Sequence, residues 1–401
     1  MERLIRMLRT FPVVLIQGAR QVGKTTLARQ LIERGVLEHY YSFDDYTTLA
    51  AARSDPVSFV RNLPPRSVLD EVQRVPEVLL AIKVRVDNQR EPGLFVLTGS
   101  THPLWRLRIG EPLVGRMGVV TLYPLPQGEF EGKRERWLDQ TLQGHCPTVV
   151  QSEGGLWERV VIGGFPPARL ASTPQQARDW FKAYIDLLLT REVRELADIE
   201  RVSDLPLILR MLAIFSTQLL NLTNLSRECG IPQTTLRRYL SLFEAMFLVT
   251  RVPAWYANIG QRFLKTPKVL DTGIACALLD IDPNRVQEDP LLKGRLLETF
   301  VGAEILKQIE FTGHSVQIYH PCSATGQEVD FVLETASGHL VGVEVKAAAS
   351  VDARAFDGLK RLQQAVGDRW RAGVVIYTGD QTVPFGEHLW AQPVSALWET
   401  G

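Results

Sequence analysis

The chain has 401 residues, too many for one ordinary domain, so we expect about two to four domains that each bury their own core. Its 45 lysines and arginines balance its 45 aspartates and glutamates. This zero net charge excludes a protein that is basic throughout, so any affinity for nucleic acid must come from a local basic patch.

The cysteines and the apolar runs bear on cellular location. The four cysteines lie far apart in the sequence, and none forms the C-x-x-C pair typical of zinc sites or redox dithiols. The apolar run near the start is too short to span a bilayer and leads directly into a glycine loop, so it indicates a first strand rather than a signal peptide. We therefore expect a cytoplasmic protein without a membrane partner.

The most specific motif follows this first strand, PVVLIQ. Residues 18–25, GARQVGKT, fit the pattern G-x-x-x-x-G-K-[ST], and a helical pattern comes next. In such a loop, backbone N–H groups wrap the phosphates of ATP, Lys24 places a cation on the outer phosphates, and the Thr25 hydroxyl ligates magnesium. The motif predicts that ATP is bound by Gly18, Ala19, Arg20, Gln21, Val22, Gly23, Lys24, Thr25 and Thr26.

A second short apolar run, in SVLDEVQ, ends in the acids Asp70 and Glu71. Alone, such a pair is more often a solvated strand end. Its place about 45 residues after the glycine loop, with a helical pattern next, favours a catalytic reading. We expect Asp70 to hold magnesium and Glu71 to polarise the attacking water.

Two further segments offer polar groups for the same site. The apolar strand in GLFVLTGS ends near Ser100, a suitable place for a group that senses the γ-phosphate. Arg116 lies on the glycine-flanked turn PLVGRMG, from which it could stabilise transition-state charge at a neighbouring subunit's ATP or at its own. An ordinary surface arginine is an equally good interpretation.

Together these segments resemble the AAA-type ATPase domain of a prokaryotic family in which that domain is fused to a C-terminal domain of unknown function, the 4143-type. The resemblance is carried by GARQVGKTTLARQL, LDEVQ, LFVLTGS and GRMGVVTLYPLPQGEF, and further on by GGFPPA, YIDLLLTREVREL, YLSLFEAMFLVTRVPAW and KTPKVLDTGIACALL. It implies ATP hydrolysis with magnesium and a homo-oligomer such as a hexameric ring. It also implies a sensor role for Ser100 and an arginine-finger role for Arg116.

The middle of the chain predicts a winged-helix-like domain over 206–285, after an ATPase domain over 1–128 with a parallel sheet and a helical connector over 129–205. A short helix ends at Gly230, and a second helix places Leu236, Leu240 and Phe243 on one face. The opposite face presents Thr234, Arg237, Arg238 and Ser241.

This segment is also the basic patch of the chain. Between residues 222 and 269, seven basic residues outnumber two acidic ones. We expect the second helix to contact duplex DNA, with its arginines on phosphates. A winged helix that contacts protein is the alternative.

The last part, 286–401, predicts one helix, three strands, a helix and a strand, the order of the restriction-endonuclease-like core of PD-(D/E)xK type. Strand alternation puts Glu344 and Lys346 on one face. A hairpin turn near Ser337–Gly338 would place Asp330 level with Val345 and beside Glu344.

These residues match the acid, acid and lysine constellation of that nuclease superfamily. Its acids hold magnesium, and its lysine positions or activates the attacking water. Glu298, on the preceding helix, matches the accessory acid. The alternatives are a solvated strand without chemistry and a surface that binds nucleic acid without cutting it.

The sequence thus predicts an α/β multidomain protein whose AAA-type ATPase drives a nucleic-acid-binding module, a motor or remodeller acting on duplex or branched DNA. One alternative is an ATP-dependent, metal-dependent DNA nuclease. A second is an ATPase switch that acts on a protein partner.

Overall fold

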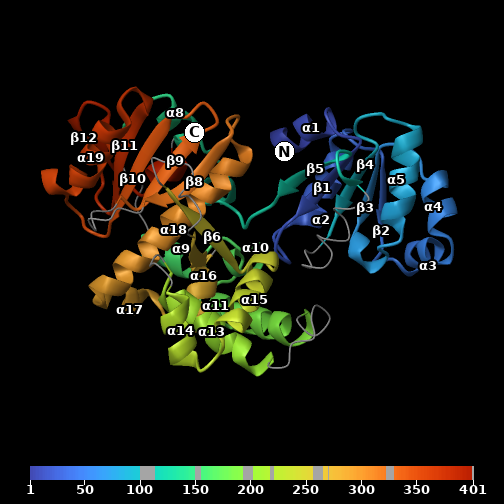
Figure 1. Ribbon diagram of the computed structural model, residues 1–401, viewed down its shortest axis with the longest axis horizontal. Helices are drawn as coiled ribbons and strands as arrows, with labels where there is room; N and C mark the ends of the chain where they lie inside the picture. The colour runs from blue at the N-terminus through green and yellow to red at the C-terminus, as the bar shows by residue number, and fades with distance from the viewer. Residues whose placement is uncertain are drawn as a thin grey trace. The chain divides into compact units, whose positions relative to one another are not determined.

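The computed structural model describes residues 1–99, 113–149, 155–192, 202–216, 221–255, 265–269, 271–321 and 329–399. The chain divides into two compact units, the first made mainly of residues 1–124 and the second mainly of residues 125–401. Each unit has its own sheet with helices packed around it (Figure 1). The predicted α/β multidomain class is confirmed.

The first unit is built on a parallel sheet of five strands in the order β2-β3-β4-β1-β5. The central strands β1, β3 and β4 are apolar over most of their length because helices cover both faces of the sheet. The strands are β1 Val13–Gln17, β2 His39–Ser42, β3 Ser67–Asp70, β4 Phe95–Thr98 and β5 Met117–Thr121.

Alternate residues of each central strand enter two separate cores. Val13 and Leu15 of β1 face one core, which α4 and α5 supply, whereas Val14 and Ile16 face the other, which α1 and α2 supply. The helical segments are α1 Glu2–Leu8, α2 Lys24–Glu33, α3 Tyr46–Ser54, α4 Pro56–Asn62, the 3₁₀ turn η1 Val72–Arg74 and α5 Val78–Asn88.

The second unit contains a mixed sheet of eight strands in the order β12-β13-β11-β10-β9-β8-β6-β7. Strand β10 pairs in parallel with β11 and antiparallel with β9, so the hairpin β9–β10 opens into a crossover through α19. The strands are β6 Val249–Trp255, β7 Lys265–Val269, β8 Val316–Pro321, β9 Phe331–Thr335, β10 Leu340–Lys346, β11 Trp370–Tyr377, β12 Val383–Gly386 and β13 Leu389–Pro393.

The helices of the second unit fall into two groups. The first precedes the sheet in sequence: α7 Gln127–Phe130, α8 Trp137–Leu142, α9 Leu156–Ile162, α10 Pro166–Arg169, α11 Pro174–Leu187, the π-helical turn η2 Leu188–Glu192, the 3₁₀ turn η3 Val202–Asp204, α13 Leu205–Ile214, α14 Leu222–Cys229 and α15 Gln233–Ala245. The second follows β7: α16 Thr272–Leu279, α17 Pro283–Glu288, α18 Pro290–Phe311, η5 Ala353–Phe356, α19 Asp357–Val366, η6 Gly367–Arg369 and α20 Ala396–Glu399.

Residues 129–205, which were expected to form one helical connector, pack against two different parts of the second unit. Helix α8 packs against α18, α20, β10 and β11, whereas α9 and α11 pack against α16. Sequence reasoning missed this division because the bonds that fix α8 come from side chains more than 150 positions away.

Long-range bonds fix the chain just after the first unit to helix α18. Lys307 donates to the Leu125 carbonyl (3.1 Å), and Glu304 accepts from the Gln127 N–H (3.0 Å). Lys307 and Glu304 are buried and also pair with each other at 2.6 Å. Because a buried ion pair is costly unless its remaining donors and acceptors are satisfied, these backbone contacts stabilise the pair and hold residues 125–127 in place.

Glu135 extends this buried network. Its Oε1 accepts from the Gly128 N–H (2.5 Å), and its side chain is buried. Burial, and then the charge of Glu304, raises the pKa of Glu135 to about 8. The folded protein therefore keeps this carboxyl protonated at pH values where the unfolded chain releases the proton.

The pKa of Glu135 predicts a pH dependence of stability. Because the pKa of Glu135 is raised in the folded state, its contribution to the free energy of unfolding is complete below the ordinary carboxyl pKa. This contribution is lost as the pH rises towards about 8. In Glu135→Gln, which cannot titrate but keeps an oxygen for Gly128, the loss of stability between mildly acidic and mildly basic pH should be smaller by about 1 kcal/mol or more. Denaturant unfolding at several pH values measures this difference, and equal pH profiles for the two proteins would contradict it.

Candidate active site

The loop between β1 and α2 has the geometry of a phosphate cradle. Gly18 has a positive φ, and a Cβ there would lie 2.1 Å from the Leu122 carbonyl oxygen, so no other residue fits. Gly23 is left-handed, with φ +99°, and forms the N-cap of α2. The first N–H groups of α2 therefore open into the loop, where an anion can accept their hydrogen bonds.

Lys24 lies inside this loop. Its side chain is buried, and Nζ donates to the carbonyl oxygens of Gly18 (3.1 Å) and Ala19 (2.7 Å). The loop thus holds an ammonium group at its centre, where phosphate oxygens could accept hydrogen bonds from it.

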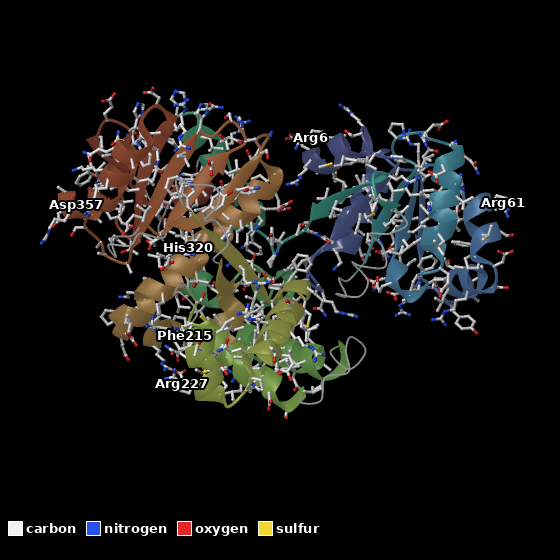
Figure 2. The ribbon with its side chains drawn as sticks, in the orientation of Figure 1. Arg6, Arg61, Phe215, Arg227, His320 and Asp357 are labelled. Carbon is white, nitrogen blue, oxygen red and sulfur yellow. The ribbon has the colours of Figure 1, made fainter. Side chains whose placement is uncertain are left out.

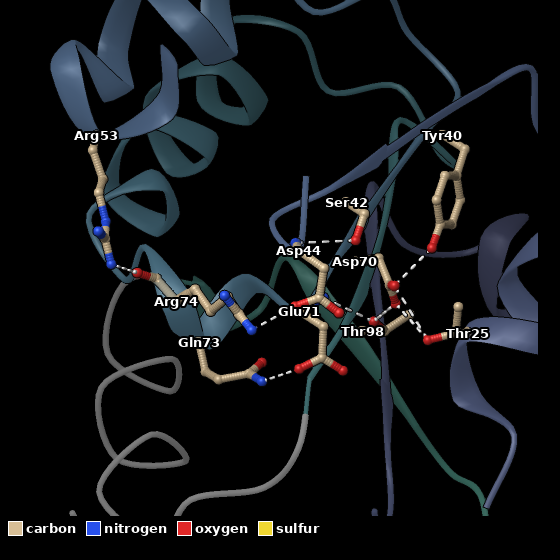
Figure 3. Close-up of polar contacts among 10 residues, drawn as sticks. All are labelled: Thr25, Tyr40, Ser42, Asp44, Arg53, Asp70, Glu71, Gln73, Arg74 and Thr98. Carbon is tan, nitrogen blue, oxygen red and sulfur yellow. Dashed lines mark hydrogen bonds and ion pairs between the residues drawn. The ribbon is translucent and has the colours of Figure 1, made fainter. Parts of the chain in front are cut away.

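Asp70, the last residue of β3, is the centre of the site (Figure 3). The Thr25 hydroxyl lies 3.2 Å from both carboxylate oxygens, and the Tyr40 hydroxyl donates to Oδ2 at 2.6 Å. The Thr98 hydroxyl donates to Oδ1. Three hydroxyls from α2, β2 and β4 thus satisfy a carboxylate that is only 2 % exposed.

Tyr40 was not foreseen as part of this site. Burial, and then its hydrogen bond to Asp70, raises its pKa to about 12, so the phenol stays a donor at physiological pH. The Arg29 guanidinium lies 5.3 Å from the centre of its ring. The sequence offered no specific signal for this role, because only the pairing of β2 with β3 in the structure brings Tyr40 to Asp70.

Glu71 follows Asp70 in a left-handed conformation, with φ +61° and ψ +40°. Its N–H donates to Thr98 Oγ1 (3.2 Å), and Gln73 donates to its carboxylate (Figure 3). Thr98 therefore connects the two acids, through the side chain of Asp70 and the backbone of Glu71. A non-glycine residue in this region carries about 1 kcal/mol of strain or more, which the surrounding bonds must offset.

These residues fit a nucleotide with its magnesium ion. The Thr25 hydroxyl and the Asp70 carboxylate adjoin, which gives a pair of oxygens suited to a hard cation, while Lys24 and the loop N–H groups suit phosphate oxygens. The Glu71 carboxylate is partly exposed, so water can reach it.

The structure places only one of the two other residues predicted for the ATP site, Arg116. Ser100 lies outside the described residues. Arg116 immediately precedes β5, and its Nε donates to Asp87 Oδ1 (2.5 Å). Because Met117 pairs with Val13 at the start of β1, Arg116 lies at the edge of the sheet opposite the P-loop. That position does not support an action on its own ATP and leaves the neighbouring-subunit role as a prediction.

The β9–β10 hairpin brings the C-terminal acids together in a register that differs from the predicted one. Val343 pairs with Phe331, which differs by one residue from the pairing that the predicted turn implies, and Asp330 precedes β9 outside the ladder. The turn explains the shift of one residue: Thr335 donates its N–H to the His339 carbonyl (2.9 Å), closing a three-residue loop over 336–338.

The charges at this hairpin are paired. Lys346 Nζ lies 2.5 Å from Glu344 Oε1, and Asp330 Oδ2 accepts from the Val345 N–H (2.7 Å). Burial, with the nearby charge of Glu298, raises the pKa of Glu344. Burial by itself would lower the pKa of Lys346, but its hydrogen bond to Glu344 and the neighbouring acids raise it.

The predicted magnesium set of Glu298, Asp330 and Glu344 is not formed as a ready ligand group. Within the part of the chain that the structure describes, no three histidine, cysteine, aspartate or glutamate side chains gather to hold one metal ion. The physical reason is visible in the contacts, because Glu344 is paired with Lys346 and Asp330 with the β10 backbone.

Helix α15 presents the predicted faces. Leu236, Leu240 and Phe243 are buried. Helices α13 to α15 precede the antiparallel pair β6–β7, and the winged-helix-like domain stays a prediction. The opposite face of α15 is exposed at Thr234, Arg237, Arg238 and Ser241.

The basic patch around α15 is smaller than the sequence indicated. Arg227, labelled in Figure 2, is also exposed on α14. Arg251 of β6, by contrast, is paired with Glu244. Arg262 lies outside the described residues, as do the side chains of Lys265 and Lys268.

Three family models match the chain. An AAA domain covers residues 10–131, and two domains of unknown function, DUF8612 and DUF4143, cover 153–285 and 293–397. The uncharacterized proteins Rv2008c of Mycobacterium tuberculosis and Mb2031c of Mycobacterium bovis are each 29 % identical over 403 residues, which is 100 % of this chain and 84 % of theirs.

Solved structures give a weaker likeness. A RuvB variant from Thermotoga maritima matches at 20 % identity and a TM-score of 0.24, covering 60 % of this chain and 82 % of that one. AMPPCP-bound DnaA from Aquifex aeolicus matches at 12 % identity and a TM-score of 0.29, covering 61 % and 85 %. At these TM-scores the likeness carries no argument about this chain.

The parallel sheet, the P-loop and the AAA model that matches residues 10–131 define the class of the first unit, an AAA domain, and support ATP hydrolase activity. More particularly, the AAA match at the N-terminus is followed by the match to a C-terminal domain of unknown function, DUF4143. No helix in the described ranges combines the length and apolar character needed to cross a bilayer.

Proposed function

We propose that the chain uses magnesium-dependent ATP hydrolysis to drive a nucleic-acid-binding module on duplex or branched DNA. The single observation that carries the hydrolytic part is the Asp70 carboxylate, which connects the P-loop residue Thr25 to the strand end that bears Glu71. The exposed arginines of α15 support the DNA part.

Each residue of the site has a distinct role in this proposal. Lys24 and the loop N–H groups bind the phosphates, and Thr25 with Asp70 would hold magnesium, which neutralises charge on the phosphate oxygens. Glu71 orients the attacking water and accepts its proton. Thr98 positions both acids, because its hydroxyl contacts Asp70 and accepts from the Glu71 backbone.

The assembly part of the proposal is a homo-oligomer, with a hexameric ring as one form, in which Arg116 reaches the ATP of a neighbouring subunit. Its ion pair with Asp87 would have to open for that contact.

Cys146, Cys229 and Cys276 are free thiols, which agrees with the cytoplasmic location that the sequence predicts.

Substitution of Glu71 tests the hydrolytic role. Glu71→Gln keeps the size and a hydrogen bond to Gln73 but removes the base, so ATP turnover should fall by about 100-fold or more while ATP binding is retained. Steady-state phosphate release measures the rate, and fluorescence titration with an ATP analogue measures binding. The control is Glu77→Gln, the same change at an exposed position. Turnover at the parent rate in Glu71→Gln would overturn the role.

The α15 face predicts how DNA binding depends on salt. Replacing Arg237 and Arg238 together by alanine should weaken duplex binding at all sequences and lower the slope of log K against log salt by about 0.9 for each phosphate that the variant no longer neutralises. Binding titrations at several salt concentrations measure the slope. Arg361→Ala, an exposed arginine on α19, is the control. Binding that is absent or independent of salt would favour the alternative, an ATPase switch acting on a protein.

A nuclease is the second candidate, and the observation that favours it is the meeting of Asp330, Glu344 and Lys346 at one hairpin. Magnesium would have to draw Glu344 away from Lys346 before the acids could share an ion. The fold of the C-terminal core as restriction-endonuclease-like belongs to the same proposal.

This candidate predicts magnesium-dependent DNA cleavage that Asp330→Ala abolishes. Asp357→Ala, at the exposed start of α19, should leave the cleavage unchanged. Gel assays measure DNA cleavage by the parent chain and by both variants, with magnesium and with a chelator. Cleavage that persists in Asp330→Ala, or wild-type protein that never cuts, would exclude this site as a nuclease centre.

A further inference from the structure

A hollow of about 820 Å³ lies in the second unit, where the chain around α8 meets the loop after α18 and strand β13. Its volume falls within the range of about 300–1,000 Å³ typical of small-molecule sites. Its lining includes neither the P-loop, nor the α15 face, nor the β9–β10 acids. The hollow is therefore a separate candidate site.

The lining contains two arginines and two histidines. Arg134 and Arg136 come from the chain just before α8, and His145 and His314 come from the loops after α8 and α18. The one acid among the described lining residues, Asp139, is engaged with the Thr312 hydroxyl. This composition favours an anionic ligand, and guanidinium groups suit phosphate in particular.

One further lining residue indicates a planar partner for that anion. Trp390 is half-buried, and its ring meets the His388 ring edge-on with the centroids 6.1 Å apart. A partly exposed indole ring suits contact with a planar ring system.

The walls are fixed by bonds that do not involve the ligand. Trp137 Nε1 donates to Gln392 Oε1 (2.8 Å), and the Leu138 N–H donates to Gln308 Oε1 (3.0 Å). Gln392 in turn donates to the Pro147 carbonyl (3.0 Å). Both ends of the lining segment are thus held before any ligand arrives, which lowers the ordering cost of binding.

We propose that this hollow binds a nucleotide unit outside the P-loop. Its phosphate would lie against Arg136 and its base against Trp390. The same chemistry is presented by a free nucleotide and by one nucleotide of a single strand, and the experiment below separates these sources.

The test uses the full chain carrying Lys24→Ala, so that the P-loop contributes little, and AMP as probe, because it lacks the β- and γ-phosphates that a P-loop holds. Calorimetric titration should detect AMP binding. Adding Arg136→Ala should weaken it by about tenfold or more, because a charge-assisted bond is removed, while Arg136→Lys should restore part of it. Trp390→Phe should bind more tightly than Trp390→Leu, and Arg361→Ala should change nothing.

Competition with a ten-residue oligo-deoxyadenylate assigns the source of the nucleotide. Displacement of AMP indicates a single strand, and failure to displace it indicates a free nucleotide; either result supports the site. Absence of both AMP and oligonucleotide binding, or equal binding by the Arg136→Ala chain, would overturn it. With Lys24 intact, Arg136→Ala should hydrolyse ATP at the wild-type rate, so failure here is distinct from failure of the hydrolytic site.

Discussion

The buried carboxylate of Asp70 is the constraint on which the nucleotide site depends. A carboxylate removed from water costs several kcal/mol unless its oxygens are hydrogen-bonded. Here Thr25, Tyr40 and Thr98 provide those bonds from three different elements. The same group thereby fixes the start of α2, the end of β4 and the position from which Glu71 leaves the sheet.

The chain that leaves this sheet is constrained at both of its ends. Leu122 donates its N–H to the Gln17 carbonyl (2.7 Å), beside the first glycine of the P-loop. Three positions later, Leu125 accepts from Lys307 of α18, the helix that also carries Glu298. The first of these bonds lies within the first unit and the second within the second unit. Coupling between ATP hydrolysis and the second unit belongs to the proposed function.

The sequence predicted the groups whose chemistry is local. The P-loop and the Asp70–Glu71 pair follow from motif and strand order, and the two faces of α15 follow from helical periodicity. What the sequence could not predict depends on distant contacts. Tyr40 joins the site only because β2 pairs with β3, and the one-residue shift of the β9–β10 register depends on how the turn closes at Thr335.

The same limit applies to groups that find partners only in the folded chain. Arg251 counted towards the basic patch in sequence, but it is paired with Glu244. Glu298, Asp330 and Glu344 share a neighbourhood without forming a ready ligand group, because Lys346 and the β10 backbone already engage two of them. Periodicity places side chains on a face, whereas only the packed structure shows what each side chain contacts.

In the proposed function, ATP hydrolysis serves a module that binds DNA. Its most direct test is the steady-state rate of ATP hydrolysis by the full chain without DNA and with single-stranded, duplex or branched DNA, at low and at high salt. We expect duplex or branched DNA to raise the rate and rising salt to remove the increase, because bonds to phosphates carry the binding. A rate that is the same with every form of DNA at low salt would contradict it.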